Sequence, residues 1–223
     1  MEKIRPHKII RSKRRTIALV ISPDATLTVR APFYLPISFI EEFIEKKSSW
    51  ILRKISELEK RPTVKGKEYV SGEGFLYLGK TYRLRYIEDH ANELVFKDAF
   101  LISKVHRKET KELFISWYKK EAEKKISERV AWYSERSGLK YKSINISNAQ
   151  KRWGSCSTTG NLNFSWRLIM APLSVIDYVV VHELVHLTEK NHSRQFWNKV
   201  KILFPGYQRH KKWLQENGHL LNV

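Results

Sequence analysis

Residues 179–193 read VVVHELVHLTEKNHS, and they place two histidines and a glutamate inside an apolar run. From Val175 to Leu187 the apolar residues lie on every side of a helix, and such a helix is normally buried. A buried polar group without a partner costs roughly 2–7 kcal/mol. His182, Glu183 and His186 therefore need partners that the apolar residues around them do not supply.

The spacing of these three residues fits a metal site. Residues four apart lie on the same face of an α-helix, so His182 and His186 can each direct a ring nitrogen at one ion. Glu183 reaches the edge of such a site, where it can hold a water. The pattern H-E-x-x-H is typical of zinc peptidases, in which the glutamate is the general base. The alternative, two core histidines bonded to backbone carbonyls, leaves Glu183 without a partner.

A catalytic zinc needs a third protein ligand and keeps its fourth position for water. The downstream candidates are Glu189, His192, His210, Glu216 and His219. Glu189 reaches the ion only if the helix continues past His186, and His192 only if the chain turns back near Lys190-Asn191. Asn191 tolerates the left-handed conformation of such a turn, and Ser193 can cap a following helix. The residues alone leave the third ligand open.

The composition favours a globular cytoplasmic protein. The chain has 223 residues, of which 42% are hydrophobic, and no apolar run approaches the roughly 18 residues of a membrane span. The N-terminal residues lack the apolar segment of a secretory signal. The single cysteine, Cys156, excludes an intrachain disulfide and suits a reducing compartment. We expect no membrane partner.

The charge of the chain is strongly basic, with a formal net charge of +19. Residues 3–15 hold seven basic residues and no acid, and residues 136–223 hold thirteen basic and four acidic residues. Such a charge distribution attracts polyanions and speeds encounter with them. The basic residues could serve nucleic acid, an acidic protein substrate or solubility alone, and the sequence leaves these three open.

The periodicity predicts an α+β fold. Strands are expected at 16–22, 26–30, 75–78, 82–87, 93–97, 100–104, 143–148 and 161–168, and the first two form a hairpin across Pro23-Asp24. Helices are expected at 36–60, at 108–137 before Gly138, from Ser174 to 187, and over 193–217 as one or two helices. Ser174 and Asp177 form an acidic variant of the capping box. We place a strand-rich N-terminal α+β domain at 1–106 and a helix-rich domain at 107–223.

One nucleotide-binding motif matches by chance. Residues 74–81, GFLYLGKT, fit the phosphate-loop pattern G-x-x-x-x-G-K-[ST]. A phosphate loop needs a helix from the lysine onward, whereas the following YRLRYI alternates like a strand. We expect two strands joined by a turn at Gly79-Lys80.

The chain resembles the YgjP-like metallopeptidases, small zincins akin to the SprT group. The resemblance is carried by RWGSC at 152–156, HELVHL at 182–187, NHS at 191–193 and FW at 196–197. Further matches are Arg14-Arg15, Ala31-Pro32, Trp50, Tyr77-Leu-Gly79, Arg167-Leu168 and Tyr178-Val179. The resemblance implies that His192 is the third ligand and that residues 107–223 form a minimal zincin-like domain.

The function expected from the motif and the resemblance is that of a zinc-dependent metalloendopeptidase acting on proteins or peptides. Zn²⁺ binds His182, His186 and His192, and Glu183 is the general base for hydrolysis by a zinc-activated water. Tyr207 and His210 are candidate donors to the oxyanion. Two alternatives stay open: a nucleic-acid-binding protein with a structural zinc, and a peptidase recruited to DNA. Structural zinc usually has four protein ligands, commonly cysteines, and this chain has a single cysteine.

Overall fold

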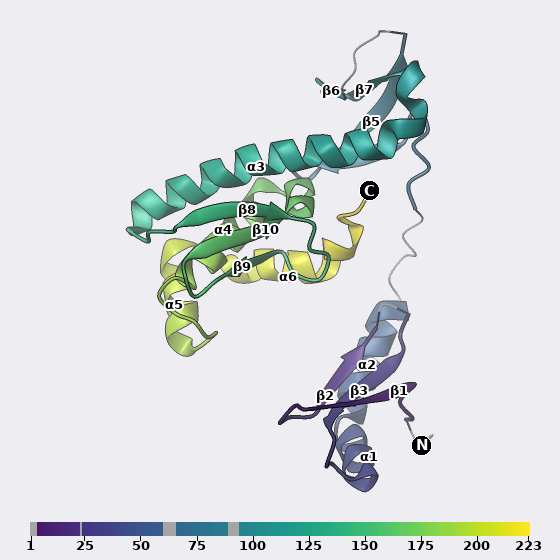
Figure 1. The fold of residues 1–223 in the computed structure, drawn as a ribbon, viewed down its shortest axis with the longest axis vertical. Helices are drawn as coiled ribbons and strands as arrows, with labels where there is room; N and C mark the ends of the chain where they lie inside the picture. The colour runs from purple at the N-terminus through teal and green to yellow at the C-terminus, as the bar shows by residue number, and fades with distance from the viewer. Residues whose placement is uncertain (1–3, 23, 60–65, 89–93) are drawn as a thin grey trace. The chain divides into compact units, whose positions relative to one another are not determined.

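The computed structural model describes residues 4–22, 24–59, 66–88 and 94–223. The chain forms two compact units, Met1–Val64 and Lys65–Val223 (Figure 1). Each unit begins with strands and combines them with helices, so the predicted α+β class is confirmed. Pro23, the start of the strand expected at 93–97, the end of the helix expected at 36–60 and Lys3 of the basic run lie outside the described residues.

The first unit is a three-stranded sheet with two helices. The predicted hairpin is present as β2 (Ala18–Ile21) and β3 (Leu27–Pro32), and β1 (Lys8–Ser12), which the sequence analysis did not predict, pairs in parallel with β3. The expected helix 36–60 is divided at Lys47 into α1 (Ile37–Lys46) and α2 (Ser48–Glu59). The core of this unit consists of Leu27, Val29, Ala31, Ile40, Ile44 and Ile51.

The second unit begins with a four-stranded sheet in the order β4-β5-β7-β6. Its strands are β4 (Gly74–Tyr77), β5 (Lys80–Ile87), β6 (Val95–Phe96) and β7 (Phe100–Ser103). β4 and β5 are antiparallel neighbours joined by Leu78 and Gly79, both with positive φ. The phosphate-loop match is therefore a β-hairpin, as the alternation of YRLRYI predicted.

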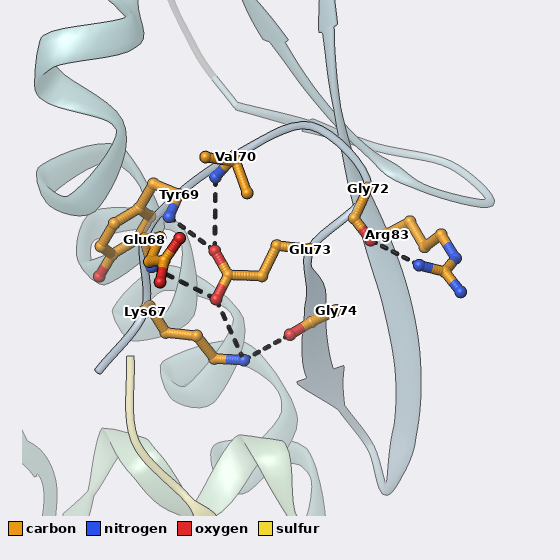
Figure 2. A network of polar contacts seen from close by, with 8 residues as sticks. All are labelled: Lys67, Glu68, Tyr69, Val70, Gly72, Glu73, Gly74 and Arg83. Carbon is orange, nitrogen blue, oxygen red and sulfur yellow. Dashed lines mark hydrogen bonds and ion pairs between the residues drawn. The ribbon is translucent and has the colours of Figure 1, made fainter. Parts of the chain in front are cut away.

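The segment before β4 is held by the carboxylate of Glu73 (Figure 2). Its Oε2 accepts a hydrogen bond from the N–H of Tyr69 at 2.6 Å, and Lys67 Nζ donates to the carbonyl of Gly74 at 2.6 Å. Tyr69 has a φ of 56°, a conformation that costs a non-glycine residue of the order of 1 kcal/mol or more. The carboxylate offsets this strain, and the Tyr69 ring packs 5.6 Å from that of Phe75.

A long helix, α3 (Thr110–Ser137), shares its core with the four-stranded sheet, and the 3₁₀ turn η1 (Lys104–Glu109) leads into it. The Phe114 ring lies 4.0 Å from that of Phe75 and 4.9 Å from that of Phe100. The helix ends at Gly138 in the left-handed conformation, as predicted. The contacts divide the chain after residue 64, and the boundary at 106/107 stays a prediction about domains.

The remaining elements surround one buried helix, α4 (Leu173–Val185). The second sheet has the order β8-β10-β9 and is followed by the 3₁₀ turn η2 (Trp166–Met170). Its strands are β8 (Ser143–Ser147), β9 (Gly154–Cys156) and β10 (Asn161–Ser165), and the chain ends with α5 (Arg194–Leu203), α6 (Tyr207–Asn217) and η3 (Gly218–Leu220). β9 was expected as a connecting loop, but it pairs with β10 at the edge of the sheet beside α4. None of the described helices is long and apolar enough to cross a bilayer.

Candidate metal centre

Helix α4 carries the first two histidines of the site. It is buried along most of its length and packs against α3, α5, α6 and β9, as its apolar sequence predicted. It begins at Leu173 after Pro172, and no side chain caps it. The predicted capping box is wrong, because Asp177 forms two hydrogen bonds with the guanidinium of Arg129 at 2.6 and 3.1 Å. This ion pair, between the buried Asp177 and the half-buried Arg129, links α4 to α3.

His186 lies where α4 ends, and its ring orientation is fixed by the turn that follows. Its Nδ1 is 2.9 Å from the carbonyl oxygen of Glu189, so Nδ1 carries the proton and donates. The Nε2 of His186 is then the unprotonated nitrogen and can bind a metal. A second-nitrogen hydrogen bond of this kind orients most metal-binding histidines.

The turn after α4 brings His192 back to the other two histidines. Ser193 caps α5 by accepting a hydrogen bond from the N–H of Phe196 at 3.2 Å, as predicted. Asn191 is not in the left-handed conformation that the sequence analysis expected; the non-glycine residues with positive φ in the described chain lie elsewhere. Among described residues, one group of histidine, cysteine or acidic side chains could hold a metal ion, and it consists of His182, His186 and His192.

The geometry of this group suits a transition-metal ion. One nitrogen of each histidine lies within 4.8 Å of the others, and the Nε2 atoms of His182 and His192 are 2.9 Å apart. Two ligands at about 2.0–2.1 Å from a tetrahedral zinc are roughly 3.3 Å apart, so a small adjustment accommodates the ion. Burial, together with the neighbouring histidines and Lys211, lowers the pKa of His182 to about 3. Neutral imidazoles are the form that binds metal.

Glu183 lies beside the histidines in a site with few polar partners. It is 5% exposed, and its Oε2 accepts no hydrogen bond from the described residues. Burial raises the pKa of its carboxyl to about 8, and the charge of Arg152 opposes that shift. In the metal-free protein this carboxyl is therefore mostly protonated at neutral pH.

The backbone of β9 approaches Glu183 closely at Gly154. A Cβ atom built at this position would lie 2.6 Å from Glu183 Cγ and 2.7 Å from its Oε1. The sequence analysis quoted Gly154 only within the family resemblance and gave it no role. A glycine inside a strand often marks a close approach of another group to the backbone, but residues 154–156 were expected to be a loop, so this signal appears only once β9 is known.

An aromatic stack supports the third histidine. The His192 ring lies 5.6 Å from Trp197 at an interplanar angle of 24°, and Trp197 lies 5.1 Å from Tyr207 at 13°. Tyr207 stacks in turn on Tyr178, whose ring lies 5.9 Å from that of His182 in a T-shaped arrangement. Tyr178 could have been found from the sequence, because it lies four residues before His182 on the same helical face.

A pocket of about 330 Å³ opens beside His182 and Glu183. Its apolar walls are Trp153, Tyr178, Val179 and Leu214. Gly154 contributes backbone to it, and helix α6 contributes Lys211 and Gln215. The predicted oxyanion donors, Tyr207 and His210, are not among the lining residues. The site therefore combines a metal-binding group, a buried carboxyl and an adjoining space for a substrate.

The other candidates for the third ligand have different partners. The carboxylate of Glu189 pairs with Lys199 at 2.7 Å. The Nε2 of His210 accepts from Arg209 at 3.0 Å, and Glu216 lies 3.7 Å from Lys212. His219 is not part of the histidine group.

A helix with H-E-x-x-H, a third histidine on the returning chain and an adjoining pocket are features that a metallopeptidase site requires. The chain belongs to the YgjP-like family, because the profile of the YgjP-like, metallopeptidase domain matches residues 15–217. This membership confirms the resemblance read from the sequence.

Two solved structures are similar to parts of the chain. One is the metallopeptidase zymogen of Pyrococcus abyssi abylysin, with 18% identity, a TM-score of 0.38 and coverage of 41% of this chain and 93% of that one. The other is the metallopeptidase zymogen of Methanocaldococcus jannaschii jannalysin, with 20% identity, a TM-score of 0.35 and coverage of 43% and 96%. No curated protein matches the sequence.

Proposed function

We propose that this metallopeptidase is a zinc-dependent endopeptidase in which His182, His186 and His192 hold Zn²⁺ and Glu183 is the general base. The observation that carries the proposal is the position of Glu183. Its buried carboxyl, with one unpaired oxygen, adjoins three histidines whose ring nitrogens lie within 4.8 Å of one another. A purely structural zinc site gives such a carboxyl no role.

Each group of the site has a separate role in peptide hydrolysis. When bound, Zn²⁺ lowers the pKa of water and polarises a carbonyl. Glu183 takes a proton from the attacking water and passes it to the leaving amine. Gly154 leaves room for the carboxyl to approach. The pocket beside it, lined by Trp153 and Tyr178, admits a substrate side chain.

The test is Glu183→Gln. The amide retains the shape of the side chain but takes up no proton, so zinc content and folding should be unchanged. Cleavage of an unstructured protein such as casein should fall by roughly 10² or more. Glu189→Gln is the matched control: it changes a carboxylate on the turn after α4 but keeps the backbone carbonyl that orients His186. Measurable wild-type cleavage that survives Glu183→Gln undiminished would remove this mechanism.

The alternatives that involve nucleic acid rest on charge alone. The +19 net charge predicts binding to DNA that weakens steeply as salt rises. A gel-shift titration with duplex and single-stranded DNA tests this directly. If no binding is found at low salt, the basic residues serve another partner or solubility.

A further inference from the structure

Lys211 is the one basic side chain that lines the pocket beside the metal centre, among the described residues. It lies on α6, and its Nζ stands 4.2 Å from the centre of the Trp197 ring. Trp197 stacks in turn on His192. Cation–π contact and stacking thus hold the ammonium close to the histidines. Burial lowers the pKa of both His182 and His192, and the positive charge of Lys211 lowers both further.

The ammonium of Lys211 has no carboxylate partner within the described chain. Its neighbour Lys212 differs, because Lys212 lies 3.7 Å from Glu216 on the same helix. Lys211 is half-buried and contacts an aromatic face, so its remaining donors are available to a ligand that enters the pocket.

The other residues that line the pocket indicate which kind of ligand it accepts. Trp153, Tyr178, Val179 and Leu214 suit an aliphatic stem, and Lys211 suits a carboxylate at its end. The Trp153 ring in the pocket wall packs closely against the backbone of Gly218, just beyond α6. A Cβ atom at Gly218 would lie 2.8 Å from that ring. The basic charge of the whole chain favours the approach of acidic substrates.

We propose that this pocket selects substrates with an acidic residue next to the scissile bond, and that Lys211 is the specificity residue that pairs with its carboxylate. The inference rests on the proposed peptidase function, because it assigns the pocket to the substrate of that site. A different role, in which Lys211 stabilises the reacting carbonyl, predicts equal effects on acidic and neutral substrates. The two roles are therefore separable.

The test uses short peptides of alanine and serine, blocked at both ends, with a single central Glu, Gln or Lys. Such peptides can slide along the site until the central residue meets the pocket. Binding is measured by calorimetry to the zinc-loaded Glu183→Gln protein, which holds peptide without cleaving it. We expect the Glu peptide to bind roughly 10-fold more tightly than the Gln peptide.

Two variants in the same background isolate Lys211. Lys211→Met keeps the aliphatic stem and should abolish the preference for Glu over Gln, and Lys211→Glu should shift it toward the Lys peptide. Lys212→Met removes the same charge one residue away and should leave the preference intact. Equal binding of the Glu and Gln peptides, failure of either to bind, or loss of the preference in Lys212→Met would overturn the inference.

Cleavage by the wild-type protein separates this inference from the proposed function. Selective binding without any zinc-dependent cleavage would refute the peptidase and leave an acidic-peptide site at Lys211. Cleavage of the Glu and Gln peptides with equal kcat/KM would refute the specificity and leave the peptidase. If Lys211→Met lowers kcat equally for both peptides, Lys211 acts on the reacting carbonyl and the inference is wrong.

Discussion

The substitution Gly154→Ala tests whether the β9 backbone positions the general base. Gly154 pairs with Phe164 in the second sheet, so its backbone cannot retreat easily from α4. The added methyl group would point at Glu183, which is fixed on a helix buried on most sides. The carboxyl must therefore move.

The size of the effect follows from the distances. The new Cβ atom would lie 2.6 Å from Glu183 Cγ and 2.9 Å from Cδ, whereas ordinary contacts begin at 3.4 Å. The side chain of Glu183 must shift by at least the 0.8 Å between 2.6 and 3.4 Å. A misplacement of about 1 Å in a catalytic group can cost roughly 10²-fold in rate. Overpacking of this kind also costs about 1–3 kcal/mol of unfolding free energy.

The assay combines casein cleavage, zinc content and urea unfolding. We expect zinc to be retained while cleavage falls about 10²-fold. Gly66→Ala is the control, because a Cβ atom there meets nothing within 4 Å. In a Glu183→Ala background the clash disappears, so Gly154→Ala should then cost little stability. If Gly154→Ala is fully active, or equally destabilising in both backgrounds, the positioning argument is refuted.

Three further predictions concern metal, pH and the helix pair. Elemental analysis should find about one zinc per chain, lost in His192→Ala and retained in Glu189→Ala, since a catalytic site has three protein ligands. In the metal-free protein, burial raises the pKa of Glu183 from 4.5 to about 8. The folded state therefore favours the protonated carboxyl, and the free energy of unfolding falls as the pH rises between these two values. Urea unfolding should therefore show an advantage for Glu183→Gln that grows from pH 5 to pH 9, to at most about 5 kcal/mol. Asp177→Ala leaves the half-buried Arg129 without its carboxylate partner and should cost about 1–3 kcal/mol of unfolding free energy. Glu216→Ala, in an exposed pair, should cost less than about 1 kcal/mol, and both values are read from urea midpoints.

The sequence by itself determined the local features of the site. The apolar run from Val175 predicted a buried helix, which is α4 as far as Val185, and the spacing of His182 and His186 put both rings on one face. Ser193 as a cap and Gly138 as a helix end were also readable, because capping depends on a few neighbouring residues. These interactions span four residues or fewer.

The tertiary structure decided which distant residues meet that helix. Of the five candidate ligands it brought His192 to His182 and His186, because the path of the turn after α4 returns its ring to them. It paired Asp177 with Arg129, where local reasoning placed a cap. It also set Gly154 against Glu183 and Lys211 in the pocket wall. Such contacts depend on how α3, β9 and α6 pack around α4, and side-chain periodicity along one segment carries no information about which segment will cover it.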